Sequence, residues 1–271
     1  ADGRADIGQY DRSDYLLELT ANYAKRLGDH NLNALVGYSF QRFTSKYLNA
    51  GNQGFLTDAF LFNNLGAGTY EKPWVGSSAS KSEMASFFGR VNYTYKDRYL
   101  VTATLRADGA SNFAKNNRWG YFPSFSAAWR ISEENFMENT RNWLNSLKLR
   151  GSWGMLGNQD ALSDGTPTGG DFYPWLNTYN LGANYPFGSA LTTGYYQSNY
   201  KIADLSWEKS TTWGIGIDAM INNKISFTFD YYDRKTTDII MEVPVPTEFA
   251  LGAYKDNVCL LYTSDAADEE D

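Results

Sequence analysis

The feature that most constrains the fold of this chain is an alternation of apolar and polar residues that returns in eight segments. Successive side chains of a β-strand point to opposite faces, so this alternation predicts strands with one apolar and one polar face. The segments are residues 15–26, 32–41, 86–95, 99–108, 119–131, 147–155, 212–221 and 225–234. The pattern predicts an all-β chain of antiparallel strands.

Charged residues on the polar face of these strands constrain its surroundings. They are Arg90, Arg106, Asp108, Arg130 and Arg150. Charged side chains are rarely buried unless paired, so this face requires water, which the lumen of a barrel supplies. No run of residues approaches the roughly 18 apolar residues of a transmembrane helix. Alternating lipid-facing and lumen-facing residues are typical of transmembrane β-strands, so the pattern favours an antiparallel up-and-down transmembrane β-barrel.

Aromatic residues make up 16% of the chain and gather near the ends of the predicted strands. Tyr93, Tyr95 and Tyr99 flank one predicted turn, and Trp119 and Trp129 bracket one predicted strand. Outer-membrane barrels carry girdles of aromatic residues at both edges of their apolar band. The distribution therefore supports the membrane interpretation.

The connections between the predicted strands alternate in length. Those at residues 27–30, 96–98 and 222–223 are short, and those at 44–84, 109–118 and 157–204 are long. The connection at 132–145 is of medium length, and we expect it to hold a small helix with Ser132 as N-cap and Glu133 and Glu134 in its first turn. Short periplasmic turns on one rim and long external loops on the other are typical of outer-membrane barrels.

Several classes of site are disfavoured by composition. The formal net charge of −7 argues against a nucleic-acid partner. A single histidine, His30, and a single cysteine, Cys259, argue against catalytic or metal chemistry built on these residues, and His30 is expected to be a solvated turn residue. The helix dipole explains the Glu133–Glu134 pair better than an acid/base role does. We predict no catalytic residues and no cofactor.

A glycine-rich stretch of the longest predicted loop contains three aspartates, Asp160, Asp164 and Asp171. Carboxylate oxygens are the ligands that calcium prefers, but their spacing matches no EF-hand loop. Calcium binding is therefore kept only as a weak alternative to a site without metal.

Four long motifs are similar to the SusC/RagA group of TonB-dependent receptors. Residues 86–137 read SFFGRVNYTYKDRYLVTATLRADGASNFAKNNRWGYFPSFSAAWRISEENFM, and residues 144–160 read LNSLKLRGSWGMLGNQD. In the same order follow LSWEKSTTWGIGIDAMI at 205–221 and ISFTFDYYDRKTTDII at 225–240. The resemblance covers about residues 15–257.

The resemblance implies a 22-stranded barrel of the outer membrane, with an N-terminal plug domain, of which this chain holds about eight strands. It further implies a SusD-like surface lipoprotein as partner and import of oligosaccharides or peptides, energised through TonB, ExbB and ExbD. We expect the plug, the TonB-contacting segment and the start of the protein to be missing from this sequence. The charged lumen residues then either line the permeation path or form structural ion pairs against the plug.

Aromatic and amide residues of the long loops are the candidate substrate contacts: Tyr173, Trp175, Asn177 and Tyr179 in one loop and Trp74 in another. Flat apolar faces with a few polar groups at their rim suit a sugar ligand. The alternative for each of these residues is a structural one, because large loops need their own packing to stay ordered.

The domain interpretation places a partial barrel domain at residues 1–258 and a non-native tail at 259–271. The sequence departs from the family pattern after GAYKDN, and residues 259–269, read back into codons, match a sequencing adapter. Two other functions stay open at this point. One is a soluble all-β module that binds or cleaves glycans, and the other is a complete eight-stranded barrel that acts as an adhesin or anchor.

Overall fold

A computed structural model of the chain describes residues 3–159, 173–176, 178–188, 190–197, 202–246 and 253–267. Its principal element is a nine-stranded antiparallel sheet in the order β1-β2-β3-β4-β5-β6-β11-β12-β13. The strands are β1 (Gly3–Leu27), β2 (His30–Phe55), β3 (Trp74–Tyr95), β4 (Tyr99–Ala110), β5 (Trp119–Arg130), β6 (Leu144–Asn158), β11 (Glu208–Ile221), β12 (Ile225–Pro244) and β13 (Ala253–Ala267). The eight predicted strands are all present, and β13 is a ninth.

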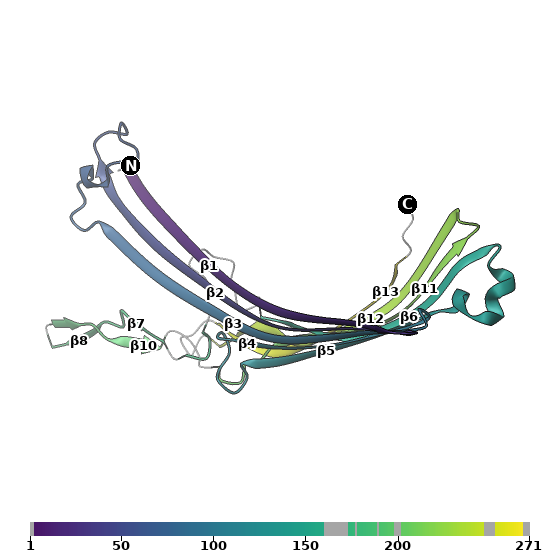
Figure 1. Ribbon diagram of the computed structural model, residues 1–271. Helices are drawn as coiled ribbons and strands as arrows, with labels where there is room; N and C mark the ends of the chain where they lie inside the picture. The colour runs from purple at the N-terminus through teal and green to yellow at the C-terminus, as the bar shows by residue number, and fades with distance from the viewer. Residues whose placement is uncertain are drawn as a thin grey trace.

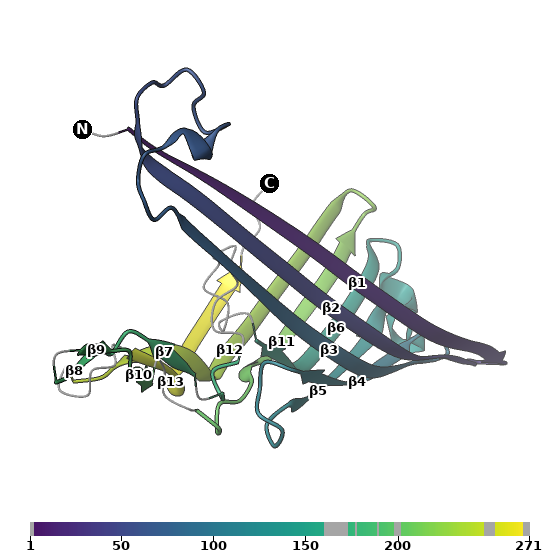
Figure 2. The ribbon, with the colours of Figure 1, turned by 90° about the vertical axis from the view of Figure 1, so that its left-hand side faces the viewer.

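The sheet curves into an open trough (Figure 1), and in a second view its long strands run side by side at a slant (Figure 2). Strands β1 and β13 occupy opposite edges of the sheet. The sheet is therefore a partial barrel, as predicted. A complete eight-stranded barrel, the third functional possibility, is contradicted by this open arrangement.

The register places the apolar residues of neighbouring strands on one face. Tyr38 pairs with Leu19 on one side and with Phe87 on the other, and Ile215 pairs with Tyr231. Directly paired residues of an antiparallel ladder share a face. Leu19 is 59% exposed, Phe87 54% and Ile215 53%, so no second layer of the described chain covers this face. An apolar face that a soluble sandwich would bury is thus open, as expected for contact with lipid.

Several strands run far beyond the predicted segments, which corrects the predicted loop at 44–84. Strand β2 continues to Phe55 and β3 begins at Trp74, so that connection is only residues 56–73. About 10 residues suffice to cross the bilayer, whereas β2 has 26. The outer part of such a strand has no lipid beside it and needs no apolar face, so the alternation that defined the predicted segments fades there.

The connections alternate between the two rims of the sheet. Residues 28–29, 96–98, 131–143 and 222–224 form one rim, and the connections β2–β3, β4–β5, β6–β11 and β12–β13 begin and end at the other. The long connection before β11 contains two small sheets, β7 (Tyr179–Leu181) with β10 (Tyr195–Gln197) and β8 (Tyr185–Phe187) with β9 (Ala190–Thr192). The connections alternate between the two rims as predicted, but their lengths alternate only if 131–143 is grouped with the short turns, because it is longer than 111–118.

The main cluster of buried apolar residues in the described chain is small and lies at the long-loop rim. It consists of Ala110, Phe113, Phe122, Leu205, Trp207 and Ile240. The Trp207 ring lies 5.1 Å from that of Phe113 and 5.4 Å from that of Phe122, and its Nε1 donates to the Arg118 carbonyl oxygen. These contacts join the connection at 111–118 to the end of the loop that precedes β11.

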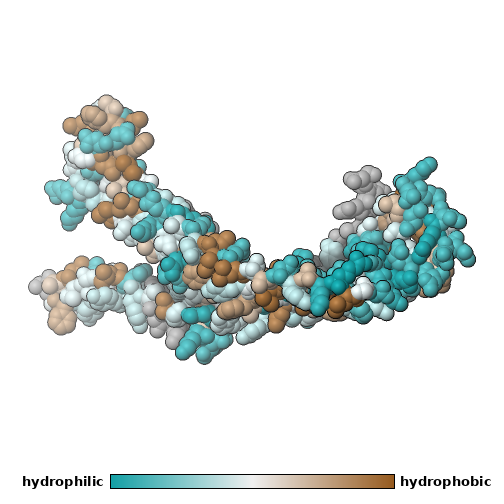
Figure 3. All heavy atoms as spheres, in the orientation of Figure 1, coloured by the Kyte–Doolittle hydropathy of each residue, from teal (hydrophilic) through white to brown (hydrophobic). Residues whose placement is uncertain are grey.

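Hydropathy varies along the molecule. In Figure 3, hydrophilic residues gather over the end with β6, β11 and the β5–β6 connection, and hydrophobic ones over the loop after β2. Leu56, Phe60 and Leu61 of that loop are all more than half exposed.

The β5–β6 connection corrects the predicted helix. It holds two 3-10 helices, η2 (Ile131–Glu133) and η3 (Asn135–Thr140), and a third, η1 (Leu65–Ala67), lies after β2. Ser132 lies inside η2 rather than at its N-cap, which is Arg130 and makes no side-chain cap. No helix in the described residues is long and apolar enough to span a bilayer.

The predicted boundary between residues 258 and 259 falls inside β13. The backbone of β13 pairs with β12 from Ala253 to Ala267. Whether residues 259–271 belong to the natural protein stays a prediction.

Candidate functional site

The first charged group of the polar face lies on β3 and β4. Arg106 Nε is 2.8 Å from both carboxylate oxygens of Asp108, and its Nη2 donates to Ser86 Oγ at 3.0 Å. The guanidinium also lies over the Phe88 ring, 5.6 Å from its centroid. Asp108 is 7% exposed, and the guanidinium of Arg106 compensates its buried negative charge.

The second charged group spans β6, β11 and β12. Arg150 Nε donates to Asp218 Oδ2 at 3.1 Å, and Arg150 Nη2 donates to Asp230 Oδ2 at 2.6 Å. Lys148 Nζ lies 3.6 Å from Asp218 Oδ2. Two cations and two carboxylates thus form one network on the polar wall. Asp218 and Asp230 were not among the predicted site residues, although their place on the polar face of the alternating pattern was a signal for them.

A hollow of about 540 Å³ lies beside this network. Its wall is formed by residues of β4, β5, β6, β11 and β12. The polar side chains that line it are those of Thr102, Ser126, Lys148, Arg150, Ser152, Thr212, Asp230 and Tyr232. We name this hollow, with the four charged residues of the network, the Arg150 niche. Its mixture of hydroxyl, cationic and anionic groups suits a polar ligand or a polar protein segment better than an apolar one.

The remaining two predicted lumen residues form hydrogen bonds outside both groups, although Arg130 pairs with Lys148 in the sheet. Arg90 Nε donates to Thr104 Oγ1 at 3.3 Å, and Arg130 Nη1 donates to the carbonyl oxygen of Asp97 at 3.3 Å in the short-turn rim. Neither arginine forms a salt bridge with another described residue. The structure therefore distributes the five predicted residues along the polar wall rather than assembling them into one site.

Trp74, a predicted substrate contact, begins β3 and is held by β1. Its Nε1 donates to Asp6 Oδ1 at 2.9 Å, and the Arg4 guanidinium carbon lies 4.6 Å from its ring centroid. Arg4 also forms an ion pair with Asp6 at 2.9 Å. These contacts give Trp74 a structural role at the edge of the sheet.

The other predicted substrate contacts differ from one another in surroundings. The Tyr173 hydroxyl donates to the Lys81 carbonyl oxygen of β3, and its ring lies edge-on to that of Trp175 at 6.2 Å. Trp175 Nε1 is buried with no hydrogen-bond partner among the described residues. Tyr179 is 62% exposed at the start of β7. Asn177 and the calcium candidates Asp160, Asp164 and Asp171 lie outside the described residues.

His30 and the two glutamates of the β5–β6 connection have specific partners. His30 Nδ1 lies 2.7 Å from the Tyr93 hydroxyl at the short-turn rim, where His30 is exposed. Glu133 Oε2 lies 3.9 Å from Arg141 Nη2. The described chain contains no group of three or more residues able to hold a metal ion.

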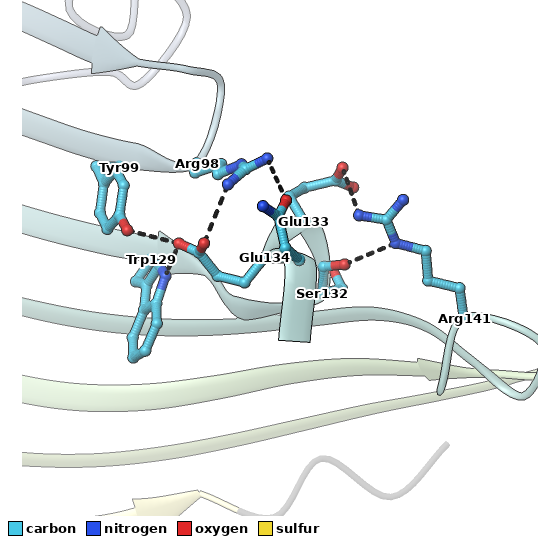
Figure 4. Close-up of polar contacts among 8 residues, drawn as sticks. Arg98, Tyr99, Trp129, Ser132, Glu133, Glu134 and Arg141 are labelled. Atoms are coloured by element: carbon cyan, nitrogen blue, oxygen red, sulfur yellow. Dashed lines mark hydrogen bonds and ion pairs between the residues drawn. The ribbon is translucent and has the colours of Figure 1, made fainter. Parts of the chain in front are cut away.

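Glu134 is the residue whose role the sequence analysis missed (Figure 4). Its Oε1 accepts hydrogen bonds from the Tyr99 hydroxyl at 2.5 Å and from Trp129 Nε1 at 3.1 Å, and its Oε2 accepts one from Arg98 Nη1 at 3.0 Å. The hydrogen bond from Tyr99, followed by that from Trp129, lowers the pKa of Glu134. A helix dipole does not explain this carboxylate, because Glu134 has extended backbone angles between two short 3-10 helices.

Comparison with known proteins places this sheet in a family. The family described as "TonB dependent receptor-like, beta-barrel" matches residues 2–268. TonB-dependent receptor SusC of Bacteroides thetaiotaomicron is 36% identical over 253 residues, which are 90% of this chain and 23% of that protein. TonB-dependent receptor P3 of Formosa agariphila is 31% identical over 262 residues, 94% of this chain and 24% of that protein.

A solved structure of the RagAB peptide transporter superimposes with a TM-score of 0.81 at 26% identity, covering 96% of this chain and 27% of the other. The chain spans about a quarter of the length of these relatives. The fold, the open apolar face and the family match agree with one another. This chain belongs to the TonB-dependent receptors of the SusC/RagA group, and its sheet is part of an outer-membrane β-barrel.

Proposed function

We propose that this chain forms part of the barrel wall and external loops of a receptor that imports oligosaccharides or peptides across the outer membrane. The observation that carries the proposal is the two-faced sheet. One face exposes Leu, Phe and Ile side chains, and the other carries the ion pairs of Arg106 and Arg150. Such a wall separates lipid from an aqueous lumen. A soluble glycan-binding or glycan-cleaving module does not account for the open apolar face.

Partners follow from the same proposal. SusC is named a TonB-dependent receptor, and RagAB is named a peptide transporter. By analogy we propose energisation through TonB, ExbB and ExbD, contacted by an N-terminal region, and a SusD-like surface lipoprotein as partner at the external rim. Import leaves the covalent structure of the substrate unchanged, so the proposal assigns no catalytic residue.

The substrate contacts are proposed in two zones. In the external loops, Tyr179 offers an exposed ring, and Tyr173, Trp175 and Asn177 lie in the same stretch of sequence. Along the lumen, the Arg150 niche offers hydroxyl and charged groups to a polar solute, and Arg90, Arg106, Asp108 and Arg130 continue the charged wall. Trp74 is the least favoured contact because Asp6 and Arg4 already occupy its polar edge and its ring.

The proposal is tested by growth of the source bacterium with oligosaccharides or with peptides as sole carbon source. The receptor is compared with a variant that lacks the segment 173–197, and each strain is paired with one in which TonB is inactive. We expect loss of growth on one substrate class in both the loop variant and the TonB-deficient strain. Unchanged growth on every glycan and peptide in both strains would refute the proposal. A loop variant that is absent from the outer membrane is replaced by Tyr179→Ala.

A further inference from the structure

A continuous series of aromatic rings crosses four strands at the short-turn rim and ends on the β5–β6 connection. We call it the aromatic row: His30, Tyr95, Tyr99, Trp129 and Phe136. The ring centroids are 4.9 Å apart for His30 and Tyr95, 6.3 Å for Tyr95 and Tyr99, 6.4 Å for Tyr99 and Trp129, and 6.5 Å for Trp129 and Phe136. The first four members lie on strands, and Phe136 lies in η3, beyond the end of β5.

The strand residues of the row belong to the lipid-facing side of the sheet. Tyr99 pairs directly with Trp129, and two residues further along the same faces Val101 pairs with Ala127. Phe125, which follows on that face of β5, is 49% exposed. Phe136 continues this surface and is 67% exposed, so its ring contacts Trp129 on one side and leaves the other side open.

Glu134 fixes the β5–β6 connection to the row. Its carboxylate accepts hydrogen bonds from the Tyr99 hydroxyl and from Trp129 Nε1, as Figure 4 shows. It also forms an ion pair with Arg98. Three donors satisfy the charge of this side chain, which is 12% exposed. Within the connection, Arg141 Nε donates to the Ser132 carbonyl oxygen at 3.1 Å, which links the start of the connection to its end. The connection is thereby held against the lipid-facing edge instead of extending freely into the periplasm.

We propose that the β5–β6 connection (residues 131–143) rests on the periplasmic surface of the outer membrane, with Phe136 inserted at the level of the lipid head groups and Glu134 as its positioning residue. Tyr and Trp rings, which are apolar with one polar end, favour the membrane–water interface, so Tyr99 and Trp129 mark its level and Phe136 adjoins them there. Continuity of Phe136 with the lipid-facing row identifies lipid as the occupant of its open side. The inference depends on the outer-membrane location and not on the proposed import.

The test uses spin labels on the receptor that contains this sheet, reconstituted in phospholipid vesicles, with Cys259 and any other free cysteine replaced. Phe136→Cys carries the label, and Glu138→Cys is the matched control, an exposed position on another face of the same 3-10 helix. We expect the label at 136 to collide more with oxygen, which concentrates in lipid, than with a water-soluble nickel chelate. The label at 138 should show the reverse. Equal access of the chelate to both positions would overturn the proposal.

A second variant separates positioning from folding. In Glu134→Gln the carboxylate and its ion pair to Arg98 are lost, while the side chain keeps its size. We expect the oxygen-to-chelate collision ratio at position 136 to fall toward that at 138, with the barrel still resistant to unfolding by detergent at room temperature. A ratio at 136 that stays as high in the folded Glu134→Gln receptor would show that Glu134 does not position the connection.

Discussion

Arg150 on β6 and Asp230 on β12 form an ion pair of 2.6 Å across the strand that lies between them. The residue of β11 that faces both is Gly216, which pairs with Arg150 on one side and with Asp230 on the other. A Cβ atom at position 216 would lie 2.5 Å from Asp230 Oδ1 and 2.7 Å from Arg150 Cζ. Glycine at this position therefore permits the arginine to reach over β11.

Gly216→Val should break this ion pair, because both side chains must move away from the new methyl groups. We expect a loss of roughly 1–3 kcal/mol of unfolding free energy, the usual range for overpacking. Urea unfolding in detergent micelles, followed by tryptophan fluorescence, measures it. Gly151→Ala is the control, since a Cβ there meets nothing closer than 3.9 Å. Equal effects of the two substitutions would contradict this explanation.

Arg106→Lys should destabilise the sheet more than Arg90→Lys. Arg106 Nε contacts both carboxylate oxygens of the buried Asp108 while its Nη2 donates to Ser86, and the single ammonium group of a lysine does not reproduce these two separate donors. The only hydrogen bond from the Arg90 side chain to a described residue goes to Thr104. We expect a cost of about 1–3 kcal/mol for Arg106→Lys and less than about 0.5 kcal/mol for Arg90→Lys. The same urea titration compares them, and a reversed order would refute the assignment.

Glu134 should make stability depend on pH. Its folded pKa is lower than the unfolded one because Tyr99, Trp129 and Arg98 favour the carboxylate. The stabilisation is therefore fully present above the unfolded pKa, roughly 4.3, and is lost as the pH falls through the folded value. The difference in unfolding midpoint between the receptor and Glu134→Gln should be largest at neutral pH and shrink in acid. A difference independent of pH would exclude this role.

Tyr179→Ala should weaken substrate binding if the exposed ring stacks on the substrate. Loss of one aromatic contact worth about 0.5–1.5 kcal/mol predicts an affinity roughly twofold to tenfold lower. Trp74→Phe is the contrasting variant, expected to leave affinity unchanged while removing the bond to Asp6. Calorimetric titration of the purified receptor with the imported substrate measures both. A larger effect at Trp74 would reverse the proposed assignment.

Residues 259–271 should be absent from the natural protein if they derive from a sequencing adapter. Amplification and resequencing of the genomic locus should give a coding sequence that departs from the present one after Val258. An uninterrupted reading through residue 271 in genomic DNA would show that the natural β13 includes this segment.

The alternation of residue types determined the class of fold, the two faces and the eight strands that cross the membrane. The long sequence motifs identified the SusC/RagA group. Both signals are local in sequence, because side-chain direction repeats every two residues in a strand. The parts of a strand outside the bilayer need no apolar face, so the alternation is lost there. For this reason the limits of β2 and β3, including the position of Trp74, were predicted wrongly, and β13 was not predicted.

Only the tertiary structure decided which charged residues act together. Arg150 is separated from Asp230 by 80 positions in sequence, and the register of three strands with a glycine between them brings the two into contact. Glu134 likewise acquires its role from Tyr99, 35 positions away on a neighbouring strand. Residue types and spacing place a charge on a face, but its partner depends on strand order and register, which are set by the packing of the whole sheet.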